Sequence, residues 1–201
     1  MRPLPRHQCF MYEGAPSVYL TPVAKVMREK LAAHWRCLYM NTAPMVAGMR
    51  TCLEANGVDV EAEAGRGSLL FRSEREHLVD GRFNVEKMIG GLKNSLDHAL
   101  RDGFQGLFAT GDMTWEFGPA GDFEKLVEYE LEVEYFIRAH PKFSAICQYH
   151  ASTLPAEVLQ HGMAAHPGIF VNETLSLINP EFVDRRYKNR TNEVRPESPA
   201  V

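Results

Sequence analysis

Two hydrophobic periods alternate along the chain. Short apolar runs, typical of buried strands, are separated by longer segments whose apolar residues recur every three or four positions, as on one face of a helix. The strand-like runs are 8–12, 36–40, 68–71, 105–110 and 143–149, and the helix-like segments are 22–31, 44–56, 85–102, 122–140 and 155–165. Two further runs, 168–171 and 175–178, predict a C-terminal β-hairpin. This order predicts an α/β fold with a mainly parallel sheet and helices on both faces.

Boundary signals place several helix ends. Thr21 is expected to cap the first helix, with Pro22 at its first position. Asn84 is expected to cap the helix over 85–102, and Gly103 to end it. Asp80–Gly81 predicts a turn just before that helix.

The segment 104–115 is the most informative stretch, because an apolar strand runs directly into Thr110, Gly111, Asp112 and Trp115. Ligands of α/β proteins sit at the carboxyl ends of the strands, so a glycine turn followed by a carboxylate and an indole predicts a ligand-binding wall. The alternative is a structural role in which Asp112 caps the following helix. The segment alone leaves both interpretations open.

Composition narrows the class of protein. The chain has 201 residues, 45% of them hydrophobic and 24% charged, which fits one globular domain. The net charge is −4, whereas a nucleic-acid-binding protein usually carries a concentrated positive charge. No apolar run is long enough to span a membrane and residues 1–6 do not resemble a secretory signal, so we expect a cytoplasmic protein. The four widely spaced cysteines, 9, 37, 52 and 147, are expected to be reduced and mostly buried.

The common nucleotide-binding and hydrolase motifs are missing. Residues 13–21, after the first strand, contain one glycine and no lysine, so they match neither of the glycine-rich phosphate loops. ATP or GTP hydrolysis is therefore disfavoured. His7 and Cys9 share a strand face and could form a metal site with Cys147 or His150. The alternative is a capping histidine and a core cysteine.

The predicted topology brings polar and aromatic residues to one edge of the sheet. Tyr12 and Glu13 end the first strand, 110–115 follows the fourth, and 148–150 ends the fifth. An apolar pocket with a few polar groups suits a small organic ligand. Glu13 and Asp112 could act as an acid/base pair or cap helices. On the helix over 122–140, Glu130 and Glu134 share a stripe, for which a solvated acidic face is the simplest interpretation.

Seven short motifs in order resemble one family. They are His7-x-Cys9-x-x-Tyr12-Glu13, Arg36-Cys-Leu-Tyr39, Asp80-Gly-Arg-Phe83, Thr110-Gly-Asp-Met-x-Trp115, Leu126-Val-Glu-Tyr-Glu130, Ile146-Cys-Gln-Tyr149 and His166-Pro167. Together they resemble the MEDS domain, the sensory domain of DcmR-like regulators from methanogens and methylotrophs. The resemblance runs from about residue 7 to about residue 178.

The resemblance implies a three-layer RecA/KaiC-like core that has lost its phosphate loop and works as a sensor of small organic molecules such as hydrocarbon derivatives. Members of the family are often attached to DNA-binding, kinase or anti-sigma modules. Two positions depart from the family pattern: Asp112 stands where glutamate is more frequent, and His150 where aspartate is more frequent. The ligand-binding residues that the resemblance implies are Tyr12, Glu13, Gly111, Asp112, Trp115, Glu130, Gln148 and Tyr149, with His7 as a further motif residue.

We therefore expect an N-terminal extension at 1–6, a sensory domain at 7–180 and an extended or disordered tail at 181–201. The preferred hypothesis is a non-catalytic sensor without a cofactor, binding a small organic ligand and acting through a homo-oligomer or a protein partner such as a kinase, a regulator or a sigma-factor pathway. Two alternatives stay open. One is an enzyme that uses Glu13 and Asp112, or a metal at His7, Cys9 and Cys147. The other is a RecA-like assembly module without a ligand.

Overall fold

A computed structural model describes residues 5–182, apart from the side chains of residues 16 and 17. Its main sheet has seven strands in the order β3-β2-β6-β7-β1-β8-β9, and every neighbouring pair is parallel except β8 with β9. These strands are β1 His7–Tyr12, β2 Arg36–Met40, β3 Leu69–Arg72, β6 Leu107–Asp112, β7 Phe143–His150, β8 Gly168–Asn172 and β9 Leu175–Ile178. A separate antiparallel pair is formed by β4 Leu78–Val79 and β5 Arg82–Phe83.

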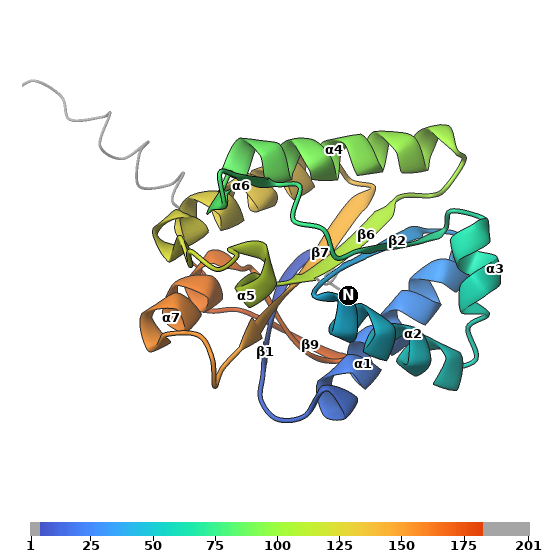
Figure 1. Cartoon of the computed structure of the whole chain (residues 1–201), viewed down its shortest axis with the longest axis horizontal. Helices are drawn as coiled ribbons and strands as arrows, with labels where there is room; N and C mark the ends of the chain where they lie inside the picture. Colours follow the sequence, from blue (N-terminus) through green and yellow to red (C-terminus); the bar gives the residue numbers. More distant parts are fainter. Residues whose placement is uncertain (1–4, 183–201) are drawn as a thin grey trace, which may run out of the picture.

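Helices cover both faces of the sheet (Figure 1). They are α1 Pro16–Ala32, α2 Ala43–Ala55, α3 Val60–Gly65, α4 Val85–Arg101, α5 Met113–Glu116, α6 Leu126–Ala139 and α7 Ala156–Ala165, with a 3₁₀ turn η1 at Phe123–Lys125. The connections from β1 to β3 step toward one edge of the sheet, and those from β3 to β8 step back. Because such crossovers are right-handed, the reversal places α1 and α2 on one face and α4 and α6 on the other.

Each face of the sheet has its own hydrophobic core. In β2, Leu38 and Met40 belong to the core beneath α4 and α6, whereas Cys37 and Tyr39 belong to the core beneath α1 and α2. All five residues of β2 are buried, as expected for a parallel strand covered on both sides. The predicted α/β class, parallel sheet and C-terminal hairpin are thus confirmed.

The start of the first helix is a correction. Helix α1 begins at Pro16, and Pro22 lies inside it, so Thr21 is not its cap. Tyr19 and Leu20 are buried, so the apolar stripe of the helix begins before Pro22. The burial of those side chains outweighs the backbone hydrogen bond that an internal proline removes.

Other differences are smaller. The sequence reading missed α3, a six-residue helix that Asp59 caps by accepting a hydrogen bond from the Ala62 amide at 3.0 Å. The helix predicted over 122–140 divides into η1 and α6. The four cysteines are free thiols, and Cys52 alone of them is only half-buried. The expectation of an extended or disordered tail falls mostly on residues 183–201, which lie outside the described residues. No helix between residues 5 and 182 is long and apolar enough to cross a membrane.

Two glycines offer a matched test of the packing. A Cβ at Gly106, just before β6, would collide with the Lys142 carbonyl and lie 2.8 Å from the Trp35 ring. A Cβ at Gly90, inside α4, would meet nothing within 4 Å. We expect Gly106→Ala to lower the free energy of unfolding by about 1–3 kcal/mol and Gly90→Ala to raise it by up to about 1 kcal/mol. Urea unfolding measures both, and equal effects would contradict this packing.

Candidate functional site

An open groove of about 230 Å³ lies at the carboxyl ends of the central strands. Tyr12 of β1, Asp112 of β6 and His150 of β7 line it, together with Tyr19 of α1 and Thr42 at the start of α2. The chain leaves β2 and β6 toward opposite faces, and the same holds for β7 and β1. Such reversals between neighbouring parallel strands leave a crevice where α/β proteins bind ligands.

Asp112 has two structural partners in this groove. One carboxylate oxygen accepts a hydrogen bond from the Tyr12 hydroxyl at 2.5 Å, and the other accepts one from the Trp115 amide at 3.1 Å. The second bond caps α5, so Asp112 is both a helix cap and part of the groove wall. Burial, followed by the charge of Asp112, raises the pKa of Tyr12, which therefore stays a hydrogen-bond donor at neutral pH.

Aromatic rings form the other wall of the groove. The Tyr12 ring stacks on Tyr19 with a centroid distance of 3.9 Å, and the His150 ring meets Tyr12 edge-on at 4.9 Å. A flat or apolar ligand body packs well against such rings, while Asp112 supplies a charged acceptor beside them. The groove thus combines apolar area with a small number of polar groups.

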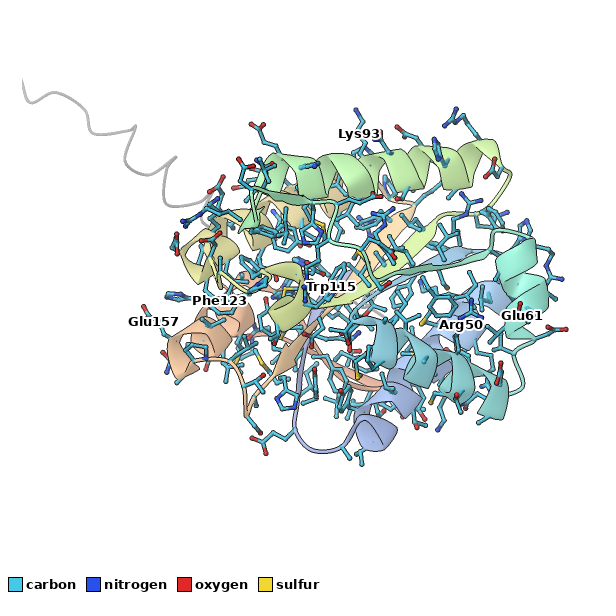
Figure 2. The ribbon with its side chains drawn as sticks, viewed as in Figure 1. Arg50, Glu61, Lys93, Trp115, Phe123 and Glu157 are labelled. Carbon is cyan, nitrogen blue, oxygen red and sulfur yellow. The ribbon has the colours of Figure 1, made fainter. Side chains whose placement is uncertain are left out.

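Trp115 anchors the floor beside the groove. Its side chain is buried, and its indole N–H donates to the Ser73 carbonyl at 3.2 Å. Its own carbonyl accepts a hydrogen bond from Arg75 at 2.9 Å. Figure 2 shows Trp115 inside the molecule, whereas Lys93, Glu61 and Glu157 point outward from their helices. Most of the Trp115 ring therefore holds the fold together rather than facing the groove.

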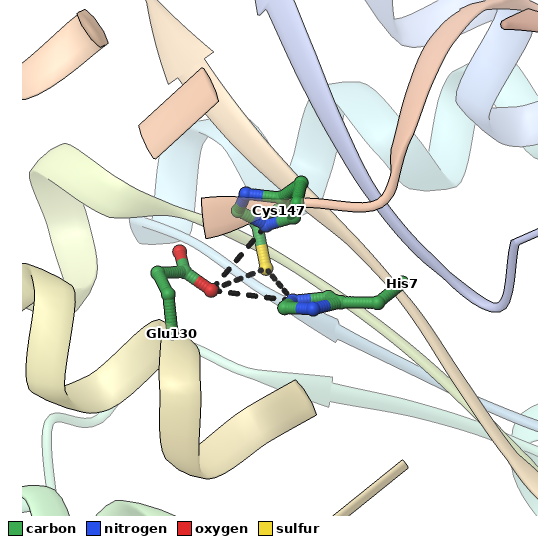
Figure 3. Close-up of side chains that lie close together, drawn as sticks. His7, Glu130 and Cys147 are labelled. Carbon is green, nitrogen blue, oxygen red and sulfur yellow. Dashed lines mark hydrogen bonds and ion pairs between the residues drawn. The ribbon is translucent and has the colours of Figure 1, made fainter. Parts of the chain in front are cut away.

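A second group of polar residues is buried on the opposite face of the sheet, beneath α6 and α7 (Figure 3). One Glu130 oxygen lies 3.3 Å from His7 Nε2, 3.3 Å from His166 Nε2 and 3.5 Å from the Cys147 sulfur. The other oxygen accepts a hydrogen bond from the Tyr149 hydroxyl. We call His7, Glu130, Cys147 and His166 the buried cluster. Their four nearest donor atoms lie within 4.8 Å of one another, and histidine, cysteine and carboxylate are all metal-ligand types.

The charges of the buried cluster balance one another. Burial by itself would lower the pKa of His7, but Glu130 and Glu134 outweigh that effect and raise it. Burial would likewise raise the pKa of Glu130, but His166 and His7 outweigh it and lower that pKa. Burial and the nearby Glu130 charge raise the pKa of the Cys147 thiol well above its ordinary value. The carboxylate is thus kept ionised by the histidines that face it.

The family model for the MEthanogen/methylotroph, DcmR Sensory domain, abbreviated MEDS, matches residues 6–167. The match includes the strand-end groove and every residue of the buried cluster. The chain belongs to the MEDS family. By its description, this is a family of sensory domains, and no curated protein is significantly similar to the chain.

Two solved structures show the fold of this MEDS domain. Uncharacterized protein PH0321 from Pyrococcus horikoshii, solved in complex with an unknown peptide, has a TM-score of 0.57 and 16% identity over 86% of this chain and 82% of its own. Flagellar accessory protein FlaH from Methanocaldococcus jannaschii has a TM-score of 0.50 and 13% identity over 86% of this chain and 76% of its own. These similarities confirm the RecA-like fold.

The ligand-binding residues predicted from the sequence do not all meet. Tyr12, Asp112 and Trp115 lie at the groove, but Glu130 and Tyr149 lie in or beside the buried cluster. Tyr149 is separated from its neighbour His150 because consecutive strand residues point to opposite faces. That the predicted residues bind a ligand remains a prediction.

Three other predicted residues are not among those that line the strand-end groove or form the buried cluster. Glu13 is exposed just beyond the end of β1. Gln148 is buried in the sheet and donates a hydrogen bond to the Thr110 hydroxyl at 2.8 Å. A Cβ at Gly111 would collide with the carboxyl of Glu116, so this glycine makes room for a buried acid.

Only some of the metal ligands predicted from the sequence lie together in the structure. His7 and Cys147 are together, whereas Cys9 packs in the adjoining apolar core and His150 faces the groove.

The reading of Glu130 and Glu134 as a solvated acidic face is wrong, because both are buried and both contact His7. Sequence reasoning also missed His166 as a partner. The available signal was the pair of histidines at the two ends of the matched region, together with two glutamates one helical turn apart.

A second groove of about 250 Å³ lies away from the strand carboxyl ends, between α1 and the β8–β9 hairpin. Its lining includes Gln8, Lys30, Ser144 and Phe170. The Lys30 ammonium lies over the Trp35 ring, 4.2 Å from its centroid, and burial lowers the pKa of this lysine. We favour the strand-end groove as the ligand site of the MEDS domain because it lies where two crossover directions reverse.

The buried acid Glu116 makes the stability of the MEDS domain depend on pH. Burial raises its pKa well above 4.5. Below about pH 4.5 the folded and unfolded chains both hold the proton, but above it only the unfolded chain releases the proton. We expect Glu116→Gln to raise the free energy of unfolding by up to about 1.4 kcal/mol for each pH unit above that value.

Urea unfolding at pH 5, 6 and 7 measures this difference. Glu128→Gln, at an exposed position of α6, is the matched control. A gap between wild type and Glu116→Gln that stays constant with pH would contradict a protonated Glu116.

Proposed function

We propose that this MEDS domain is a cytoplasmic, non-catalytic sensor that binds a small organic molecule in the strand-end groove. Bound ligand would alter a surface read by a second protein of a regulatory pathway. The observation that carries the proposal is the groove itself: Tyr12, Tyr19, His150 and Asp112 meet at the switch point of a RecA-like sheet. The MEDS match, which assigns the chain to sensory domains, supports the same conclusion.

The chemistry of the groove favours a small organic ligand over a nucleotide. Its volume of about 230 Å³ is below the range of roughly 300–1,000 Å³ typical of sites for drug-sized ligands. The connection from β1 to α1 is only residues 13–15, and it exposes the carboxylate of Glu13. A phosphate would meet negative charge there instead of a lysine and a nest of backbone amides. A hydrocarbon derivative with one hydrogen-bond donor for Asp112 fits better.

The surroundings of Asp112 supply a route from ligand to surface. Asp112 caps α5, and α5 is tied to the segment before β4 by three hydrogen bonds, one of them from the Trp115 indole to the Ser73 carbonyl. Arg75 donates to the Trp115 carbonyl, and the His77 ring lies 2.6 Å from the Glu116 carbonyl oxygen. A ligand that binds two arrangements of this segment with different affinity would shift their populations.

Filling the groove tests the proposal. Thr114 is exposed and lines the groove, so Thr114→Trp should fill it without disturbing the core. We expect thermal-shift screening with alcohols, ketones, haloalkanes and small aromatic acids to yield hits on wild type that Thr114→Trp loses. Thr51→Trp, at an exposed position of α2, is the control and should keep them.

Asp112→Asn is the complementary variant, because asparagine can still cap α5 but carries no charge. It should weaken hits that carry a hydrogen-bond donor and leave purely apolar hits unchanged. If wild type and Thr114→Trp bind the same compounds equally well, the ligand binds outside the groove. If only nucleotides bind, the proposed ligand class is wrong.

Self-assembly is the second candidate function, and one observation favours it. Strand β9 is the last strand of the sheet, and its side chains Leu175, Leu177 and Ile178 are exposed. An apolar edge strand is a template for pairing with another chain, here a second copy of this one. We expect light scattering to show a dimer that Leu177→Lys dissociates, whereas Val18→Lys, at an exposed position of α1, does not. A wild-type monomer would exclude this function.

A further inference from the structure

We propose that the buried cluster binds a divalent transition metal ion, with Zn²⁺ as the best fit. The ligand atoms are His7 Nε2, Glu130 Oε2, Cys147 Sγ and His166 Nε2. They come from β1, α6, β7 and the residue that follows α7, so the ion would join four segments that are far apart in the sequence. This proposal is independent of the strand-end groove, which lies on the other face of the sheet.

Four of the six distances among these ligand atoms are those of a tetrahedral site. Ligands at zinc distances in a tetrahedron lie about 3.3 Å apart for two nitrogen or oxygen atoms and about 3.6 Å apart when one is sulfur. The Glu130 oxygen lies 3.3 Å from each histidine nitrogen. The Cys147 sulfur lies 3.5 Å from that oxygen and 3.7 Å from His7 Nε2. These four distances match those of a tetrahedral site, and Figure 3 marks them with dashed lines.

The hydrogen bonds that both histidines make through Nδ1 orient their Nε2 atoms toward the other atoms of the buried cluster. His7 Nδ1 lies 3.1 Å from a Glu134 oxygen, and His166 Nδ1 lies 2.6 Å from the Gly162 carbonyl oxygen. A carbonyl or carboxylate oxygen can only accept, so each Nδ1 carries a proton, and Nε2 is the nitrogen of each ring that can bind a metal ion. This arrangement of histidine with an outer acceptor is the usual support of a metal ligand. Glu130 is held in the same way by the Tyr149 hydroxyl.

The two Nε2 atoms and the Cys147 sulfur converge on one Glu130 oxygen, and the space between these four atoms can be occupied by a cation. His7, Glu130 and His166 are fully buried, and His166 Nε2 has no hydrogen-bond partner among the described residues. A bound cation would satisfy both rings, the carboxylate and the cysteine sulfur at once. Burial of such unpaired groups is costly.

The donor set selects the class of ion. Two imidazoles, a thiolate and a carboxylate suit zinc and other first-row transition metals, whereas magnesium and calcium prefer oxygen ligands alone. All four tetrahedral positions are filled by the protein, and this is the pattern of structural sites rather than catalytic ones. We therefore assign the ion a role in holding α6 and α7 against β1 and β7.

Metal analysis of the tag-free full chain, purified without chelator, is the first test. We expect about one equivalent of zinc or another first-row metal per chain, and a melting temperature that falls when the metal is stripped and recovers when Zn²⁺ is restored. Cys147→Ser and His166→Gln should lose the metal. Cys9→Ser is the matched control, because Cys9 is a buried cysteine of the adjoining core, and it should retain the metal.

Cobalt substitution keeps the proposal testable even if those variants fold poorly. Wild type loaded with Co²⁺ should show the intense visible bands of tetrahedral coordination and a near-ultraviolet thiolate-to-cobalt band. Glu134→Gln, which removes the charge behind His7 without removing a ligand, should weaken Zn²⁺ binding roughly 10- to 100-fold in competition with a chelator.

Three results would overturn the site. They are a folded wild-type chain that neither contains nor takes up metal, a cobalt spectrum without the thiolate band, and metal content unchanged in both Cys147→Ser and His166→Gln.

Discussion

The central strands β1, β6 and β7 are parallel and covered on both faces, and the rest of the structure depends on this constraint. Each strand residue must enter one of two compartments, and neighbours along a strand enter opposite ones. Tyr12 and Asp112 thus reach the groove on the side of α1, whereas His7 and Cys147 reach the buried cluster on the side of α6. Two chemically different sites arise from the same three strands.

The two sites differ in their access to solvent. The groove is open, but Asp112 is itself buried, and its two carboxylate oxygens are satisfied by a hydroxyl and a backbone amide. Glu130 has no contact with water, and transferring a carboxylate out of water costs several kcal/mol unless other groups compensate. The compensating groups come from three segments other than α6, so the polar centre also fixes how these four segments pack. Removing one partner of Glu130 should therefore weaken the packing of all the segments that meet there.

The fold could be predicted from the sequence further than the sites could. Alternating periods are local, and they located the strands that form the sheet. The start of α1 could not be located in this way, because two prolines offered a first helical position and the burial of Tyr19 and Leu20 decided between them. The burial of Glu130 was also beyond local reasoning, because it depends on His166 returning over β1 after α7. The family motifs contained both His166 and Glu130, but nothing in them indicated that the two side chains meet.

In the proposed function, Asp112 would transmit a signal without a large movement. Its cap on α5 is worth about 0.5–2 kcal/mol, and a ligand hydrogen bond to the same carboxylate is worth about 0.5–1.5 kcal/mol. The two energies are comparable, so a ligand that competes with the Tyr12 hydroxyl or the Trp115 amide can change the equilibrium of a four-residue helix. A difference of about 1.4 kcal/mol between two arrangements already changes their ratio tenfold. Because Ser73, Arg75 and His77 hold α5 against the neighbouring segment, that change would reach the segment before β4 through three hydrogen bonds.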